Sequence, residues 1–342
     1  MNVVLIVPTG IGCEIGGHAG DAQPVAKLIG KCCANLITHP NVVNASDINE
    51  MPDNTLYVEG SSLDKFLQNK ISLRPVKQNK ILVAVHKVDW QSMNAVNAAR
   101  ASIGCNAEIV ELTTPLRLVA TIVNGCASGE VYGWEELVEQ VKDYEFDALG
   151  IATPIEVSPT TLKDYFISGG VNPVGGVEAV ASKLIAEKLG KPVAHGPVDY
   201  SLQEFKEVVD PRRSVEMITE NFVHCLLKGL NKAPAIIDEN ITPSLNDIKV
   251  SDVDIMISPA GCWGIPHEEC YIKNIPIMIV EENRCVLNNG YPDTGKEEDG
   301  NLIFVSNYIE AAGYLMSMQA GVYPPTVRRP LSQTKVLSKT YQ

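Results

Sequence analysis

Short apolar runs alternate with amphipathic stretches, and this alternation is the feature that most constrains the fold of the chain. The runs are mostly continuous and rich in Val and Ile, which is typical of strands covered on both faces. The predicted strands are 2–7, 56–58, 80–85, 108–112, 148–152, 192–194, 254–257, 275–280 and 302–305. Helical patterns lie between them, at 22–34, 94–102, 134–144, 177–189, 213–230 and 308–319. The pattern predicts βαβ units and therefore an α/β fold, with a mainly parallel sheet and helices on both faces.

The chain length of 342 residues favours two α/β lobes around one crevice. Loop-like stretches near 155–159 and 234–246 are the places where one lobe could give way to the next. We therefore predict an N-terminal lobe at 1–155, a C-terminal lobe at 156–325 and a surface tail at 326–342.

Charge and apolar patterning exclude several classes of partner. The net charge of −13 makes nucleic acid an unfavourable partner, because such a surface repels phosphate backbones. No apolar run approaches 18 residues, so no membrane span is expected. Met1 leads straight into an apolar run without a basic segment, which predicts a cytoplasmic protein without a signal peptide. The nine cysteines are then expected to be reduced, and Cys32, Cys33, Cys105, Cys225 and Cys285 to be small buried side chains.

The glycine-rich loop at 8–21 is the first candidate binding site. It follows a strand and opens a helix, so the backbone N–H groups of Gly16 and Gly17, near Asp21, are placed to hold an anion. The alternative is a tight turn without a ligand. The loop has neither a G-x-G-x-x-G pattern nor a Gly-Lys-Ser/Thr ending, so no nucleotide cofactor is predicted. His39 and Asn41 follow another apolar segment, at the strand end where parallel sheets bind ligands.

A second glycine-rich segment at 168–178 precedes a helix and is the strongest anion-site candidate on physical grounds. Its four glycines are costly to order unless the backbone approaches a ligand closely. The predicted binding residues of this segment are Gly170, Asn172, Gly175 and Gly176. Glu178 falls in the first helical turn, where a carboxylate also acts as a simple cap.

Further downstream, two residues are placed to act on a bound ligand. His195 ends a predicted buried strand, and a functional role for it weighs about evenly against a structural one. Arg212 precedes a long predicted helix and could reach a carboxylate or phosphate.

The segment 258–264 places Cys262 in a small-residue loop after a strand, which resembles the setting of an activated thiol. The spacing of Cys262, His267 and Cys270 is a weak metal pattern without a fourth ligand, so no metal is predicted. Glu282 and Asn283 follow another strand and are expected at the same crevice.

These segments resemble the family known as domain of unknown function 3326, found in cyanobacteria and chloroplast-bearing plants. The similar segments are 10–22, 36–42, 56–60, 172–178, 194–195, 261–264 and 280–283, so the resemblance covers most of the chain. Cys13, His18, His267 and Cys270 depart from the family's pattern. The resemblance implies a fold and a set of candidate site positions, but it implies no established activity.

The leading hypothesis is an enzyme that acts on a small anionic metabolite without a cofactor. Cys262 would be the nucleophile or proton-transfer thiol and His195 its base, with Glu178 or Glu282 orienting the imidazole. This arrangement suits an amidohydrolase, an acyl transferase or a cofactor-free isomerase. The alternatives are a metabolite-binding protein without turnover and, more weakly, an oxidoreductase resembling isopropylmalate dehydrogenases. A homodimer is expected only from the general frequency of symmetric dimers.

Overall fold

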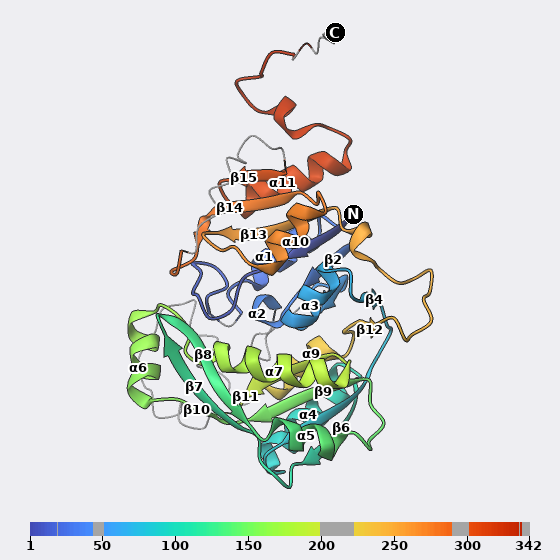
Figure 1. Cartoon of the computed structure of the whole chain (residues 1–342), viewed down its shortest axis with the longest axis vertical. Coiled ribbons are helices and arrows are strands. Elements are labelled where there is room, and N and C mark those ends of the chain that lie inside the picture. The colour runs from blue at the N-terminus through green and yellow to red at the C-terminus, as the bar shows by residue number, and fades with distance from the viewer. Residues whose placement is uncertain (19, 44–50, 199–221, 289–300, 335, 337–342) are drawn as a thin grey trace.

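A computed structural model describes residues 1–18, 20–43, 51–198, 222–288, 301–334 and 336. Its larger sheet is wholly parallel, with six strands in the order β15-β14-β13-β1-β2-β3 (Figure 1). These strands are β1 (Asn2–Leu5), β2 (Asn35–Thr38), β3 (Thr55–Tyr57), β13 (Ile255–Ala260), β14 (Ile277–Arg284) and β15 (Leu302–Val305). The order grows outward from β1 in two directions, so β1 and β13 flank the point where the direction of the chain reverses.

A second parallel sheet has four strands in the order β11-β9-β5-β6. Its strands are β5 (Lys80–Val85), β6 (Asn106–Glu111), β9 (Ala148–Thr153) and β11 (Val193–Pro197). Beside it lies a three-stranded sheet made of β7 (Arg117–Val123), β8 (Cys126–Tyr132) and β10 (Ile155–Glu156). Strands β7 and β8 form an antiparallel hairpin across Asn124 and Gly125, whose φ angles of 52° and 81° suit a tight hairpin turn.

The two parallel sheets take different parts of the chain. The short antiparallel pair of β4 (Ser72–Arg74) and β12 (Ala235–Ile237) lies where the chain leaves the six-stranded sheet and where it returns. The strands before β4 and after β12 belong to the six-stranded sheet, and those between them to the other two sheets. Residue 155, where we predicted the end of the N-terminal lobe, lies between β9 and β11, which pair within one sheet.

Helices cover both faces of the six-stranded sheet, because the side chains of its strands alternate between two cores. Val3 and Leu5 of β1 share one core with α1 (Gln23–Gly30) and α11 (Tyr308–Gln319). Val4, between them, lies in the opposite core with residues of α3 and α10. These helices span Gly60–Leu67 and Ile265–Ile272.

The four-stranded sheet is covered in the same way. Val83 of β5 packs toward α4 and α9, whereas Leu82 packs toward α5 and α7. These helices are α4 (Trp90–Ser102), α5 (Trp134–Val141), α7 (Gly175–Leu189) and α9 (Val223–Leu230). Two further helices are α2 (Pro40–Val43) and α6 (Pro159–Ser168). The predicted fold, a mainly parallel sheet with helices on both faces, is confirmed.

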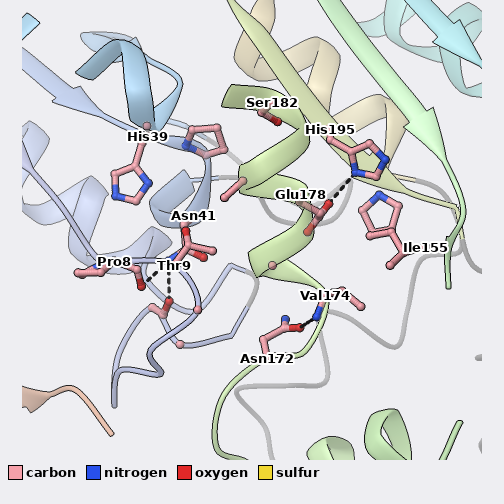
Figure 2. A pocket seen from close by; sticks show the side chains of 18 of the residues that line it. Pro8, Thr9, His39, Asn41, Ile155, Asn172, Val174, Glu178, Ser182 and His195 are labelled. Carbon is pink, nitrogen blue, oxygen red and sulfur yellow. Dashed lines mark hydrogen bonds and ion pairs between the residues drawn. The ribbon is translucent and has the colours of Figure 1, made fainter. Parts of the chain in front are cut away.

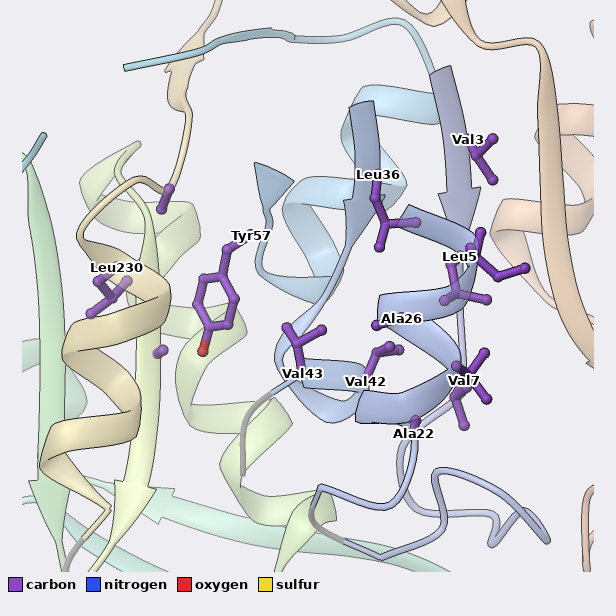
Figure 3. Close-up of a cluster of buried hydrophobic side chains, with 14 of the residues drawn as sticks. Val3, Leu5, Val7, Ala22, Ala26, Leu36, Val42, Val43, Tyr57 and Leu230 are labelled. Carbon is purple, nitrogen blue, oxygen red and sulfur yellow. The ribbon is translucent and has the colours of Figure 1, made fainter. Parts of the chain in front are cut away.

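Tyr57 connects the core of the six-stranded sheet with that of the four-stranded sheet, as Figure 3 shows. Its ring lies against Gly229 of α9, where an added Cβ would come within 2.6 Å of ring atoms. The core on one face of the six-stranded sheet therefore continues into the core beneath the four-stranded sheet. This continuity holds the strand ends of the six-stranded sheet opposite α7, which packs on the four-stranded sheet.

We predict that Gly176→Ala destabilises the protein. A Cβ on Gly176 would lie 2.3 Å from the backbone carbonyl of Ala127 in β8, so helix α7 and the hairpin would have to separate. The free energy of unfolding, measured by denaturant titration, should fall by about 1–3 kcal/mol.

The matched control is Gly313→Ala in α11, where an added Cβ meets nothing within 4 Å. Removing a glycine from that helix should raise the free energy of unfolding by about 0.5–1 kcal/mol. Equal effects of the two substitutions would contradict the close approach of α7 to β8.

Candidate functional site

The first described cavity lies at the carboxyl ends of β1, β2 and β3, opposite the first turns of α7 and the end of β11 (Figure 2). Its volume is about 190 Å³, which suits a small metabolite. Much of the wall is apolar, and its larger apolar side chains are Pro8, Ile155, Val157, Leu162, Phe166 and Phe222. Eight residues predicted from the sequence also line it, namely Gly16, Gly17, His39, Asn41, Asn172, Gly175, Glu178 and His195.

Glu178 and His195 form an ion-pair-type contact within this cavity. Nδ1 of His195 lies 3.0 Å from Oε1 of Glu178, and Nε2 lies 3.0 Å from the hydroxyl oxygen of Thr153. The ring thus bridges the carboxylate at Nδ1 and the threonine hydroxyl at Nε2. The side chain of Glu178 is 22% exposed and that of His195 is 0% exposed. The carboxylate, not the imidazole, is therefore the group that a ligand can reach.

His39 is a neutral histidine in the cavity wall. Its burial lowers the pKa of the imidazole to about 4. Nε2 accepts a hydrogen bond of 3.1 Å from the backbone N–H of Val7, so the ring proton lies on Nδ1. His39 thus brings one N–H donor to the site and carries no charge at neutral pH.

Two side chains hold the glycine-rich loop in place. The amide nitrogen of Asn41 donates to the carbonyls of Val7 and Gly16, at 2.9 and 3.1 Å. Oδ1 of Asp21 accepts from the backbone N–H groups of Gly16 and His18, at 2.9 and 3.2 Å. The N–H of Gly16, which we predicted to bind an anion, is therefore already donated within the loop. Asp21 orders the loop and does not line the cavity.

The second glycine-rich segment divides into residues at the cavity and residues with other roles. Oδ1 of Asn172 accepts from the N–H of Val174, 3.0 Å away, and forms a tight turn just before α7. Gly175 lines the cavity, whereas Gly176 is needed for the packing of α7 on β8. Gly170 has a φ of 98°, which favours glycine, and is not part of the wall.

The charges of the wall do not favour an anion. Among its described residues there are two carboxylates, Glu59 and Glu178, and no Lys or Arg. The carboxylate of Glu59 is buried and accepts the N–H groups of Ser61 and Ser62 at the start of α3, each at 2.9 Å. Arg212, the predicted cation, lies outside the described residues.

Cys262 does not line the cavity that contains Glu178 and His195. The sulfur of Cys262 lies 3.2 Å from the carbonyl of Pro259 and 3.9 Å from Nε2 of His267. Burial lowers the pKa of His267 to about 4, and its Nδ1 accepts from the N–H of Gly264. The ring proton therefore lies on Nε2, so His267 is no base for the thiol. A hydrogen bond to Cys285, with burial, raises the pKa of Cys262.

Asn283 and Glu282 also differ from their predicted roles. Asn283 is completely buried, and its amide bonds both the N–H and the carbonyl of Ile15, each at 2.9 Å. It donates in addition to the hydroxyl of Tyr308. Glu282 is exposed and lines neither described cavity. Asn283 therefore clamps the glycine-rich loop instead of binding a ligand.

The described residues contain no group of three His, Cys, Asp or Glu side chains arranged to hold a metal ion. The sulfur of Cys270, which the sequence spacing places near Cys262, points to the sulfur of Met256 instead, 3.7 Å away.

Sequence reasoning did not single out several residues of the wall. Thr9, Glu59 and Ser182 were not named, nor was Thr153, which contacts His195. Glu59 had a usable signal, because it follows a predicted strand within the similar segment 56–60. Ser182 had none, since it is one polar residue of an ordinary helix.

These features define a doubly wound α/β protein with a small, largely apolar cavity that contains a glutamate–histidine pair. The chain belongs to the family described as Protein of unknown function (DUF3326), whose model matches residues 2–328. It is also similar to an uncharacterised lipoprotein of Synechococcus sp., with 32% identity over 95% of this chain and 92% of that protein. Within the described part of the chain, no helix has the length and apolarity that crossing a membrane requires.

We predict that His39 makes the protein less stable in acid. The unfolded chain takes up a proton on this residue near pH 6.5 and the folded chain only near pH 4. Its neutral form is fully compatible with folding above about pH 6.5, and stability is lost as the pH falls toward 4. The loss attributable to His39 should reach about 2–3 kcal/mol at pH 4.5.

The measurement is the free energy of unfolding of His39→Gln and of the parent at pH 7 and pH 4.5. The glutamine variant should lose less stability between the two pH values, because glutamine cannot be protonated there. His86→Gln, at an exposed position, is the control and should behave like the parent. An identical pH dependence for His39→Gln would refute the assignment of a buried neutral imidazole.

Proposed function

We propose that this protein is a cofactor-free enzyme that transfers a proton on a small, largely apolar carbonyl compound, with Glu178 as the acid–base group. The observation that carries the proposal is the partly exposed carboxylate of Glu178, held 3.0 Å from the buried ring of His195 inside an apolar cavity. Carboxylates in such surroundings are common proton acceptors and donors in enzymes.

The roles of the two residues are the reverse of those expected from the sequence. Glu178 contacts the ligand and takes a proton from the carbon next to its carbonyl group. His195, fixed from behind by Thr153, positions the carboxylate through the bond to Oε1. The N–H of neutral His39 is a donor in the same cavity for the oxygen on which negative charge develops. The proton then returns from Glu178 to carbon, which completes an isomerisation or racemisation.

The described wall favours a ligand without a strong negative charge. Its two carboxylates would repel an anion, and Phe166 and Phe222 add apolar surface to the wall. The N-terminus of α7 at Gly175 offers only a partial positive charge. A neutral ketone or aldehyde therefore fits these residues better than the small anionic metabolite expected from the sequence.

The thiol chemistry expected from the sequence has no support from this geometry. Cys262 is buried, its pKa is raised, and it does not line the cavity. Acyl transfer through a cysteine would need that sulfur at the ligand. Proton transfer needs only groups that already line the wall, together with the residue that orients one of them.

The proposal is tested by hydrogen–deuterium exchange on candidate substrates. Small ketones, aldehydes and 2-oxo acids are incubated with the protein in D₂O, and deuterium incorporation next to the carbonyl is followed by NMR. We expect exchange with at least one neutral carbonyl compound, and a rate at least about 100-fold lower in Glu178→Gln.

Glu282→Gln is the matched control, because it neutralises an exposed carboxylate outside the cavity and should leave the exchange rate unchanged. His195→Gln should lower the rate less than Glu178→Gln does. Equal rates in Glu178→Gln and the parent would refute the proposal. Binding of these compounds without any exchange would instead support a metabolite-binding protein without turnover.

We also propose that the protein works in the cytoplasm. All nine cysteines are free, including Cys13 and Cys285, whose sulfur atoms are 3.3 Å apart, as expected in a reducing compartment. The similar Synechococcus protein is called a lipoprotein. Cell fractionation decides between the two locations: recovery in the membrane fraction would contradict the cytoplasmic one.

A further inference from the structure

Three free cysteines meet at the carboxyl ends of the central strands, away from Glu178. Cys13 lies in the loop after β1, Cys262 follows β13, and Cys285 follows β14. All three are buried, and the sulfur atoms of Cys13 and Cys285 are 3.3 Å apart. Strands β1 and β13 flank the point where the order of the sheet reverses, which is where open α/β sheets commonly place functional residues.

The backbone around Cys13 and Cys285 has the geometry that a disulfide requires. The two residues face each other in an isolated antiparallel bridge. The flanking bonds run from the N–H of Glu14 to the carbonyl of Arg284 and from the N–H of Val286 to the carbonyl of Gly12, at 3.1 and 2.7 Å. This pattern defines a non-hydrogen-bonded pair, whose Cα atoms lie about 4.5 Å apart. That separation falls within the range of disulfides, about 4.4–6.8 Å.

The protons of the cluster are distributed unequally. The thiols of Cys13 and Cys262 hold the pKa of Cys285 below its usual range, because both stabilise a thiolate there. The hydrogen bond with Cys285, together with burial, raises the pKa of Cys13. Of the two thiols, Cys285 therefore loses its proton more readily, and Cys13 is the one that retains it.

Cys285 also has access to a cavity of its own. It lines a second cavity of about 240 Å³ together with Gly261, Glu281, Arg284 and other residues at the ends of β13 and β14. The cavity is large enough for a small hydroperoxide, and neither Cys13 nor Cys262 lines it. Of the three cysteines, Cys285 is the one that lines this cavity.

We propose that Cys285 and Cys13 form a reversible, peroxide-reactive disulfide site. The thiolate of Cys285 attacks the peroxide, the O–O bond breaks, and Cys285 becomes a sulfenic acid while the other oxygen leaves as an alcohol or water after protonation. The sulfur of Cys13 then attacks that of Cys285, the S–O bond breaks, and water leaves with the proton of Cys13. A dithiol reductant restores both thiols. The sequence alone had predicted only a small buried side chain at Cys285.

This site is independent of the proposed proton transfer, although one loop connects them. Gly10 and Gly12 line the first cavity on one side, and Gly12 is bonded through its carbonyl to Val286 beside Cys285. A disulfide at Cys13 would fix that loop to the end of β14 without involving Glu178 or His195.

The test treats the full reduced chain with hydrogen peroxide and counts its thiols. We expect the loss of two of the nine thiols and a peptide map that links Cys13 to Cys285, with full recovery after dithiothreitol. The rate should change little between pH 6 and pH 8, whereas an ordinary thiol, with a pKa of about 8.5, would react about tenfold faster per pH unit over most of that interval. Nine unreacted thiols, or a link that joins a different pair, would overturn the proposal.

Two variants separate the formation of the sulfenic acid from the formation of the disulfide. In Cys13→Ser, peroxide should leave a sulfenic acid on Cys285 that dimedone captures, and no disulfide should form. Cys262→Ser is the matched control, because it removes a thiol of the cluster and should still yield the link between Cys13 and Cys285. If a variant fails to fold, the peptide map of the parent chain still decides the question. None of these measurements depends on proton-transfer activity, so the two proposals are tested separately.

Discussion

The clamp of Asn283 on the backbone of Ile15 is the interaction on which the rest of the site depends. A single buried amide accepts the N–H and donates to the carbonyl of one loop residue, and Tyr308 holds it from the other side. Buried amides are costly to desolvate unless their hydrogen bonds are made, so these bonds strongly favour one position of the loop. Asn41 and Asp21 fix the same loop farther along. The cavity wall and the cysteine pair are both built on a backbone that these side chains hold.

The first cavity combines a small, largely apolar space with a partly exposed carboxylate. His195 is fully enclosed and holds only one oxygen of Glu178, so the rest of the carboxylate remains available at the wall. Because the surroundings are largely apolar, electrostatic interactions inside the cavity are stronger than they would be in water. His39, kept neutral by burial, adds a donor without adding a charge.

Much of the fold could be predicted, because strand periodicity and helix stops are local signals. The predicted helix 308–319 coincides with α11, and each predicted strand overlaps an observed one. The hairpin of β7 and β8 was missed, although Asn124-Gly125 is a strong turn signal, since the runs on either side are only half-buried. The absence of Cys262 from the cavity wall of His195 was missed for a different reason. Cys262 follows β13 and His195 lies within β11, and these two strands belong to different sheets. Nothing in the local sequence says which strands share a sheet.

The pairing of β1 with β13 has a consequence for folding of the protein during its synthesis on the ribosome. Asn2 contacts Asp254 across 252 residues, so the centre of the six-stranded sheet cannot close until most of the chain has been made. At about 5–20 residues per second, β1 waits roughly 10–50 s for its neighbour. The strands of the four-stranded sheet all lie within that interval and can pair while β1 has only β2 and β3 beside it. The apolar flank of β1 is therefore the surface that a chaperone would have to shield during synthesis.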